Sequence, residues 1–403
     1  MRKVPTIAVA LAVGAAACTT PRPGGASDAP GAARPAPDAA RGAPARGTDG
    51  TAADAPPLGD DALADAPPAD AAPPERAPRA DASAGAEATT DGDATPPVYP
   101  IHFTVVVHLE GWNLQRPDVR AKYVDLVQKL GTAAAERGAR LTFETWSLVP
   151  AIEQGAPNVL VALAQAGHGI GLHADLGGPA QTTADYTLED FVADLVDRKT
   201  RLEAVVGAPI RTVSGICSPL DWVTAAVQAG FEAADGQVAY CLQSLPPERI
   251  PAAYQDCDSP AACHQPYPGT HEAILYPWRV ADGATWTQPT PDGDLILFHS
   301  GLGLQCATER LANPDASITN TCAFTIDDAD AVVDDLEATF PHADPTRFKS
   351  YVSVFSFGKP LPLPVLDRLV ERLQPHVEAG QVVWSTLPEM LDAYLAAEAA
   401  RAD

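Results

Sequence analysis

Short apolar runs and longer amphipathic runs alternate along the chain from residue 98 to its end, which predicts alternating strands and helices. Residues 101–107 (IHFTVVV) are mostly β-branched and aromatic, and the run is long enough for one buried strand. Residues 118–137 instead repeat their apolar positions every three or four residues, as one face of a helix does. Further strands are predicted at residues 140–146, 168–173, 210–214, 295–299, 351–357 and 381–384. Further helices are predicted at residues 158–166, 188–206, 219–229, 327–339, 363–377 and 387–399.

This alternation is typical of an α/β fold with a parallel sheet, and the length favours a sheet closed into a barrel. Residues 239–290 break the rhythm, are rich in Pro and Cys, and are expected to form a long insertion. In such barrels the chemistry lies where strands end and loops begin. The carboxyl ends of the strands are therefore where a functional site is expected.

The N-terminus has the layout of a cleaved secretory signal over residues 1–17. Met1-Arg2-Lys3 is positively charged, residues 4–14 are apolar, and three alanines stand directly before Cys18. A cysteine in this place resembles the lipidated first residue of mature bacterial lipoproteins. The alternative is an ordinary signal peptide in which the cysteine is incidental.

Residues 19–97 hold 15 prolines, no aromatic residue and only two large aliphatic residues, Leu58 and Leu63. Such a segment cannot bury enough apolar surface to offset the entropy lost on ordering. Residues 18–97 are therefore expected to be a disordered tether that begins at the lipidated Cys18. The folded domain is expected over residues 98–403.

The chain carries 52 Asp and Glu against 27 Lys and Arg, a formal net charge of -25. Nucleic acids and anionic membrane surfaces attract clustered positive charge, so neither is an expected partner. Contact with a membrane is expected only through the lipid on Cys18, at a cell surface or in a periplasm.

The predicted domain contains six cysteines, an even number in a chain with an export signal, which favours disulfides. The expected pairs are Cys217–Cys241, Cys257–Cys263 and Cys306–Cys322. A zinc site built from Cys257, Cys263, His264 and His271 is the alternative, although the spacing suits a structural zinc site poorly.

Two predicted strands end with a pair of potential metal ligands two residues apart. The pairs are His108 with Glu110 and His173 with Asp175. In an extended chain residues i and i+2 point to the same side, so both pairs are expected to face one small volume. Such a mixed nitrogen and oxygen set suits a divalent transition metal.

Other residues near the predicted strand ends could join this site. Glu144 and His299 stand at the ends of two further strands. A single residue of this kind is more often a solvated or hydrogen-bonding group, and it is the convergence that favours a site. Four tryptophans could give a sugar ring flat surfaces to stack on, although core packing is the commoner role of each: Trp112, Trp146, Trp278 and Trp286.

Four stretches of the domain resemble the polysaccharide deacetylase family, the carbohydrate esterases with a NodB-homology domain. Residues 107–111 (VHLEG) lie where the family has Thr-Phe-Asp-Asp-Gly, and residues 166–173 (AGHGIGLH) look like its Gly-His-Glu-Ile-Gly-x-His. Residues 211–231 are similar to its Arg-x-Pro-x-Gly segment and following helix, and residues 295–300 (LILFHS) to its Leu-Leu-His-Asp. The resemblance implies a distorted (β/α)7 barrel, here with a disulfide-bearing insertion.

The resemblance also implies roles for single residues. Glu110 takes the place of the metal-binding Asp, His173 of the first metal-binding His, Arg211 of the Arg beside the base, and His299 of the acid. Two family positions differ, because Leu109 stands where the base is expected and Gly177 where the second metal-binding His is expected. Either His108 and Asp175 supply the missing base and metal ligand, or the domain is a non-catalytic relative. The metal that the resemblance implies is zinc, with cobalt or nickel as alternatives.

These observations predict an exported, lipid-anchored hydrolase that removes N- or O-acyl groups from an envelope or extracellular glycan, peptidoglycan included. Asp175, or else His108, is expected to take a proton from a metal-bound water, and His299 to protonate the leaving group. Two alternatives stay open. One is a carbohydrate-binding or envelope-scaffold lipoprotein without activity, and the other is a glycoside hydrolase that uses paired carboxylates.

Overall fold

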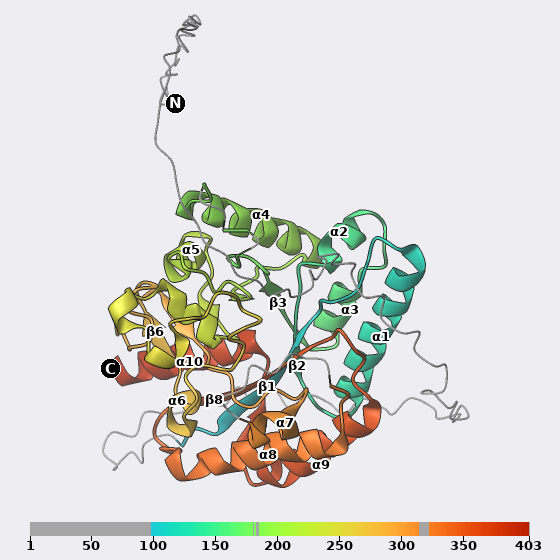
Figure 1. The fold of residues 1–403 in the computed structure, drawn as a ribbon. Helices are drawn as coiled ribbons and strands as arrows, with labels where there is room; N and C mark the ends of the chain where they lie inside the picture. The colour runs from blue at the N-terminus through green and yellow to red at the C-terminus, as the bar shows by residue number, and fades with distance from the viewer. Residues whose placement is uncertain (1–97, 180, 183–184, 314–321, 403) are drawn as a thin grey trace, which may run out of the picture. The chain divides into compact units, whose positions relative to one another are not determined.

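The computed structural model describes residues 98–179, 181–182, 185–313 and 322–402 (Figure 1). The predicted signal peptide, Cys18 and the tether of residues 18–97 lie outside the described residues. The strands are β1 (Ile101–His108), β2 (Leu141–Glu144), β3 (Gly169–His173), β4 (Thr212–Ser214), β5 (Ala233–Ala234), β6 (Trp278–Val280), β7 (Leu295–Leu297), β8 (Lys349–Ser356) and β9 (Val382–Trp384). The helices are α1 (Pro117–Glu136), α2 (Leu148–Glu153), α3 (Val159–Gln165), α4 (Leu188–Val206), α5 (Trp222–Gln228), α6 (His271–Leu275), α7 (Ala307–Ala312), α8 (Ile326–Thr339), α9 (Leu363–Glu378) and α10 (Leu387–Ala402).

The strands form one sheet in which β7, β5, β4, β3, β2, β1 and β8 follow one another in parallel. The two ends of this row meet, because Ser300, which follows β7, forms a parallel bridge with Val352 of β8. The backbone N–H of Gly301 donates to the Val352 carbonyl at 2.9 Å. The predicted α/β barrel with seven parallel strands is therefore confirmed. β6 adds an antiparallel strand beside β7, and β9 pairs with the first half of β1.

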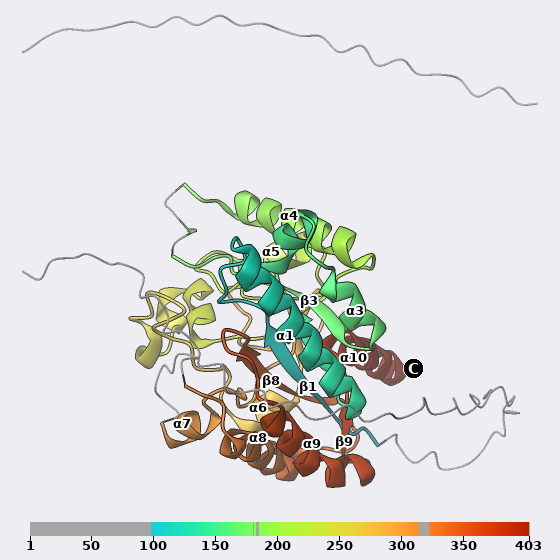
Figure 2. The same ribbon diagram turned by 90° about the vertical axis from the view of Figure 1, so that its right-hand side faces the viewer.

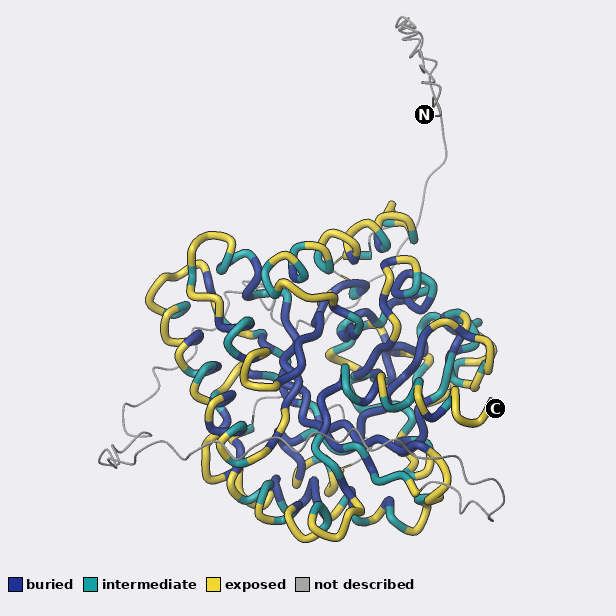
Figure 3. The backbone as a smooth tube through the Cα atoms, turned by 180° about the vertical axis from the view of Figure 1, so that it is seen from behind, coloured by how far each residue is buried: buried dark blue, intermediate teal, exposed yellow. Residues whose placement is uncertain are grey.

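The interior of the barrel contains an apolar cluster, and polar side chains lie above it at one rim. Val106, Ala233 and Ile296 belong to one buried apolar cluster with Leu391 of α10. Because side chains alternate along a strand, the residue two positions after Val106 again points inward, and it is His108. This alternation places the polar groups at the carboxyl ends of the strands. Figure 3 shows the buried strands at the centre and the exposed backs of the surrounding helices.

Capping residues in the sequence fix the ends of the outer helices α4 and α8. α4 starts with a capping box in which Thr187 and Asp190 bond each other's backbone, and it ends at Gly207, whose φ of 77° suits glycine. α8 starts with the same device, built from Thr325 and Asp328. In both Figure 1 and Figure 2, α8 and α9 lie side by side on one flank of the barrel, and α1 runs along another.

Each strand and helix predicted from the sequence has a counterpart, with ends shifted by a few residues. The sequence did not predict α2, β5 or α7, which are short and carry no clear periodicity. The insertion at residues 239–290 consists of α6, β6 and the 3-10 turns Ala239–Ser244, Pro247–Arg249 and Ala252–Tyr254; a fourth 3-10 turn, Phe340–His342, follows α8. Within the described residues no helix is long and apolar enough to cross a membrane.

The six cysteines of the domain pair as expected. The disulfides are Cys217–Cys241, Cys257–Cys263 and Cys306–Cys322. The alternative zinc site is wrong, because two of its four ligands, Cys257 and Cys263, are joined to each other.

We expect Gly301→Ala to lower the free energy of unfolding by about 1–3 kcal/mol, the usual cost of overpacking a tight interior. Gly301 lies where β7 and β8 meet and close the barrel. A Cβ at Gly301 would lie 2.6 Å from the Tyr351 hydroxyl oxygen and nearer still to its ring. The matched control is Gly269→Ala, whose Cβ would meet only the Pro266 carbonyl oxygen at 4.0 Å. Chemical denaturation measures both free energies of unfolding. Equal stability of the two variants would contradict the tight closure.

Candidate active site

Five neighbouring strands each end with a polar side chain at the same rim of the barrel. His108 of β1 is in register with Glu144 of β2, and His173 of β3 is in register with Ser214 of β4. Asp235 directly follows β5, which pairs with β4. Parallel pairing thus brings residues from distant parts of the sequence into one cluster.

His173 is the centre of this cluster. Its Nε2 lies 3.0 Å from Asp175 Oδ1 and 3.2 Å from Glu110 Oε2, and its Nδ1 lies 2.8 Å from Ser214 Oγ. Burial would lower the pKa of His173, but the carboxylates of Asp175 and Glu110 outweigh it and raise this pKa well above its ordinary value. The two carboxylates therefore favour the positively charged imidazolium, and a metal ion bound at Nε2 would supply positive charge at the same place.

Ser214 sets the orientation of the His173 ring. A hydroxyl has one hydrogen, and the Ser214 hydroxyl donates it to Glu144 Oε2. Its oxygen must therefore accept a hydrogen bond from His173 Nδ1–H. Nδ1 therefore carries a hydrogen whether the ring is charged or neutral. In the neutral ring this leaves the Nε2 lone pair directed at Glu110 and Asp175, as a metal ligand requires.

Glu110 and Asp175 differ in their environments. Burial would raise the pKa of Glu110, but the hydrogen bond and charge of His173, with smaller contributions from His108 and Ser356, lower it to about 2. Asp175 is 61% exposed and adopts a φ of 50°, a left-handed conformation that Asp tolerates better than most residues. Glu110 is thus a permanently ionised, sheltered group, whereas Asp175 faces solvent.

Glu144 and Asp235 lie deeper, with 0% and 3% of their surface exposed. Burial and the neighbouring Glu144 carboxylate raise the pKa of Asp235 well above its ordinary value. Nε2 of His108 lies 3.5 Å from Glu144 Oε2 and 3.2 Å from Ser214 Oγ, and its ring stacks on that of His173 with centroids 3.9 Å apart.

Two groups of potential metal ligands share His108. In the first, His108, Glu110 and His173 bring one ligand atom each within 4.8 Å of one another. In the second, His108 does the same with Glu144 and Asp235. Imidazole nitrogens combined with carboxylate oxygens fit a divalent transition metal. A third group, Cys306, Glu309 and Cys322, has both sulfur atoms in a disulfide and offers no thiolate.

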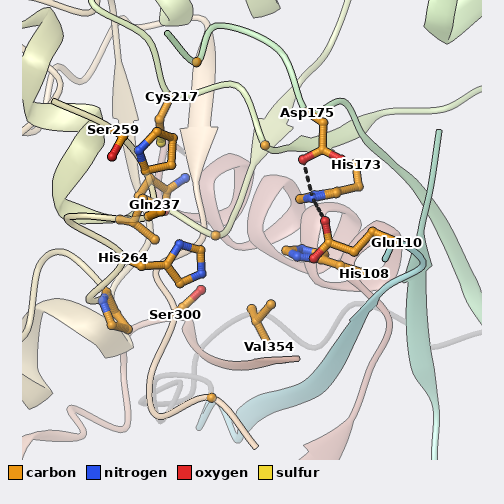
Figure 4. A pocket seen from close by; sticks show the side chains of 18 of the residues that line it. His108, Glu110, His173, Asp175, Cys217, Gln237, Ser259, His264, Ser300 and Val354 are labelled. Carbon is orange, nitrogen blue, oxygen red and sulfur yellow. Dashed lines mark hydrogen bonds and ion pairs between the residues drawn. The ribbon is translucent and has the colours of Figure 1, made fainter. Parts of the chain in front are cut away.

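A cavity of about 510 Å³ opens in front of the cluster. His108, Glu110, His173 and Asp175 line one side, and Figure 4 shows Gln237, Ser259 and His264 on the opposite side. The far wall comes from the insertion. Cys217 itself lines the cavity, and His264 follows Cys263, so two disulfides hold this wall.

Two of the expected catalytic residues lie away from the cluster. Arg211 precedes β4, a strand of only three residues, and so stands at the opposite rim from Ser214. There its guanidinium contacts Glu232 at 2.6 Å and Asp392 at 2.5 Å. The role expected for Arg211 beside the base is therefore wrong.

His299 is fully buried and does not line the cavity, although the next residue, Ser300, does. Its ring lies 3.9 Å from that of Trp278, and neither of its nitrogens has a hydrogen-bond partner among the described residues. Burial lowers the pKa of His299 to about 3. Its imidazole is therefore neutral rather than an imidazolium acid at neutral pH, and the expected acid role is not supported.

The groups expected to bind substrate are engaged elsewhere. The faces of Trp146 are covered by Arg198 and Arg201 at 4.9 and 4.6 Å. Trp286 is fully buried, Trp278 contacts His299, and Trp112 donates to the Phe357 carbonyl beside a separate, smaller hollow. Within the described residues none of these four lines the main cavity, and neither does Glu144. The expectation that they bind substrate is therefore corrected.

The sequence analysis missed Ser214, Asp235 and Gln237, and considered His264 only as a zinc ligand. Ser214 ends a three-residue strand and Asp235 follows a two-residue strand, so neither carried a periodic signal. The one available signal was that both directly precede a glycine.

No family model and no curated protein matches this sequence. Solved structures do match. Puue Allantoinase is 12% identical, with 75% of this chain and 95% of that chain covered and a TM-score of 0.48. A probable polysaccharide deacetylase from Pseudomonas aeruginosa PAO1 is 11% identical, with 74% and 94% covered and a TM-score of 0.47.

Solved polysaccharide deacetylases are thus among the structures that resemble this chain. At these identities and TM-scores the likeness assigns no activity to it.

We predict that Ser214→Ala weakens zinc binding by about 10- to 100-fold, the usual effect of losing a group that orients a metal-binding histidine. The variant removes the acceptor for His173 Nδ1–H and the donor to Glu144. Ser353→Ala is the matched control, because its hydroxyl donates to the Leu302 carbonyl instead. Calorimetric titration with zinc measures both. Unchanged affinity in Ser214→Ala would contradict the assigned tautomer.

Proposed function

We propose that this chain is an exported, metal-dependent deacylase that removes an N- or O-acyl group from an envelope or extracellular polysaccharide. One observation carries the proposal. Glu110 and Asp175 approach the same nitrogen of His173, at 3.2 and 3.0 Å, on the wall of an open cavity. A histidine and two carboxylates beside a substrate-sized space are the means of metal-assisted hydrolysis.

The metal we infer is zinc, with cobalt or nickel as alternatives, held by Glu110, His173 and Asp175. When bound, such an ion polarises an acyl carbonyl and lowers the pKa of a coordinated water toward about 7. Glu110 suits the ligand role, because its pKa of about 2 keeps it ionised at any physiological pH.

Asp175 is our candidate for the proton acceptor. Only its Oδ1 contacts His173, so Oδ2 remains able to accept a proton from water. Its exposure allows that proton to pass on to solvent. Leu109, at the position where the family resemblance expects a base, is buried in the hydrophobic core and cannot serve.

His264 is our candidate for the proton donor, in place of His299. It lines the cavity opposite the cluster, where a leaving group would lie once the acyl carbon faces Glu110 and His173 (Figure 4). Burial lowers the pKa of His264, and the positive charge of Arg310 adds to that effect. We therefore expect acyl release to depend on a proton that His264 receives within the complex.

The site favours deacylation over glycoside hydrolysis. A glycosidase needs one carboxyl group that stays protonated beside the substrate. The carboxyl group with the raised pKa is Asp235, which is buried and does not line the cavity. The binding-module alternative rests on Leu109 and Gly177, which replace the family's base and second metal ligand.

Export and anchoring through Cys18 remain part of the proposal. They rest on residues 1–97, and the three disulfides support an oxidising compartment. A glycan of the peptidoglycan type is the substrate that we would test first.

We predict that His173→Ala and Glu110→Ala each lose zinc and reduce acetate release from acetylated glycans by at least about 100-fold. The control is His271→Ala, which removes a histidine paired with Asp335 outside the cavity and leaves both properties intact. Metal analysis and acetate release are the measurements. New reducing ends would indicate a glycosidase, and glycan binding without metal or acetate release would indicate a binding module.

We also predict that His299→Phe keeps most of the acetate release. His299 is buried, holds no hydrogen bond among the described residues and does not line the cavity. Replacing an unpaired buried polar group with an apolar one of similar shape is often neutral for stability. A loss as large as that of His173→Ala, with the fold intact, would restore His299 to a catalytic role.

A further inference from the structure

Behind the cavity-facing cluster lies a second group of potential metal ligands, formed by His108, Glu144 and Asp235. One ligand atom from each lies within 4.8 Å of the other two. Glu144 and Asp235 are both more than nine-tenths buried. Neither carboxylate lines the cavity, whereas His108 does, so the group lies behind the cavity wall and meets it only through His108.

The inner group has more buried acceptors than donors. Both oxygens of Asp235 and Oε1 of Glu144 lack a hydrogen-bond partner among the described residues. The Ser214 hydroxyl donates to the remaining oxygen of the pair, Glu144 Oε2. Buried carboxylates are strongly unfavourable unless they are hydrogen-bonded, paired or bound to a metal.

A single proton shared by Glu144 and Asp235 would not neutralise both carboxylates. It would neutralise one of the two carboxylates and leave the other to its contact with His108. A divalent cation neutralises both charges and engages the oxygens that hydrogen bonds do not reach. The basic group that faces Glu144 is His108, whose Nε2 lies 3.5 Å from its carboxylate.

Gly171 lets the oxygens of Glu144 and Thr212 pack closely against β3. A Cβ on Gly171 of β3 would lie 2.5 Å from Glu144 Oε1 and 2.7 Å from the Thr212 hydroxyl oxygen. That hydroxyl also lacks a partner among the described residues. A side chain at residue 171 would therefore displace these oxygens, and glycine is what allows them to gather there.

We propose that the chain binds a second divalent cation at this inner site, through His108 Nε2, Glu144 Oε1 and an oxygen of Asp235. One nitrogen with carboxylate oxygens suits zinc, manganese or ferrous iron. A neutral imidazole ligates through one nitrogen only, so His108 belongs to the inner set. The outer set is then Glu110, His173 and Asp175, and each set has one histidine and two carboxylates.

Ser214 connects the two sites. Its hydroxyl contacts His173, His108 and Glu144, at 2.8 Å and 3.2 Å for the two histidines. The two rings stack with centroids 3.9 Å apart. The centre is therefore dinuclear, with an outer cation facing the cavity and an inner one that fixes the ligand-bearing strand ends.

The test counts metal equivalents in the purified full chain. The protein is stripped with a chelator and then titrated with zinc, and bound metal is measured by elemental analysis and calorimetry. We expect two equivalents in the wild type and one in each of Asp235→Asn and His173→Ala. The double variant is expected to bind none, and the surface control Asp392→Asn to bind two.

One equivalent in the wild type, retained with the same affinity in Asp235→Asn, would overturn the inner site and leave a shared proton as the occupant. If Asp235→Asn does not fold by circular dichroism, Glu144→Gln takes its place, and the wild-type count decides in either case. One equivalent with acetate release removes the inner site but keeps the proposed function. Two equivalents without acetate release would support the inner site but contradict the proposed function.

Discussion

The Ser214 hydroxyl has one hydrogen, and its oxygen lies beside two histidines and a buried glutamate. Because the hydrogen goes to Glu144, the oxygen can only accept from His173 Nδ1–H. This one constraint turns His173 Nε2 toward Glu110 and Asp175. The orientation of the cavity-facing cluster thus depends on a group that does not itself carry charge.

The barrel and half of the cluster could be predicted from the sequence. His108 with Glu110 and His173 with Asp175 stand two residues apart at strand ends, and this spacing was enough to predict that they meet. Glu144 was predicted near them, but not its complete burial. Burial depends on which neighbours cover a rim, and those neighbours are residues far away in the sequence.

The remaining members could not be predicted, because their strands are too short to have a pattern. The family resemblance pointed to Arg211, which directly precedes β4. The three residues of β4 cross from one rim of the barrel to the other, so Ser214 at the end of the strand reaches the site instead. At Gly177 the backbone itself excludes the residue that the family resemblance expected. With a φ of 85° and Ser218 where a Cβ would be, its backbone has no room for the histidine that the resemblance expected.

Two of the three disulfides hold the wall of the cavity that faces the candidate ligands. The strand ends that carry the candidate ligands are fixed by backbone pairing, but the facing wall is made of turns and loops joined at Cys217–Cys241 and Cys257–Cys263. A newly made chain with free thiols would have its barrel before it had a complete pocket. Oxidation after synthesis would then be the step of maturation that gives the recognition surface its final shape.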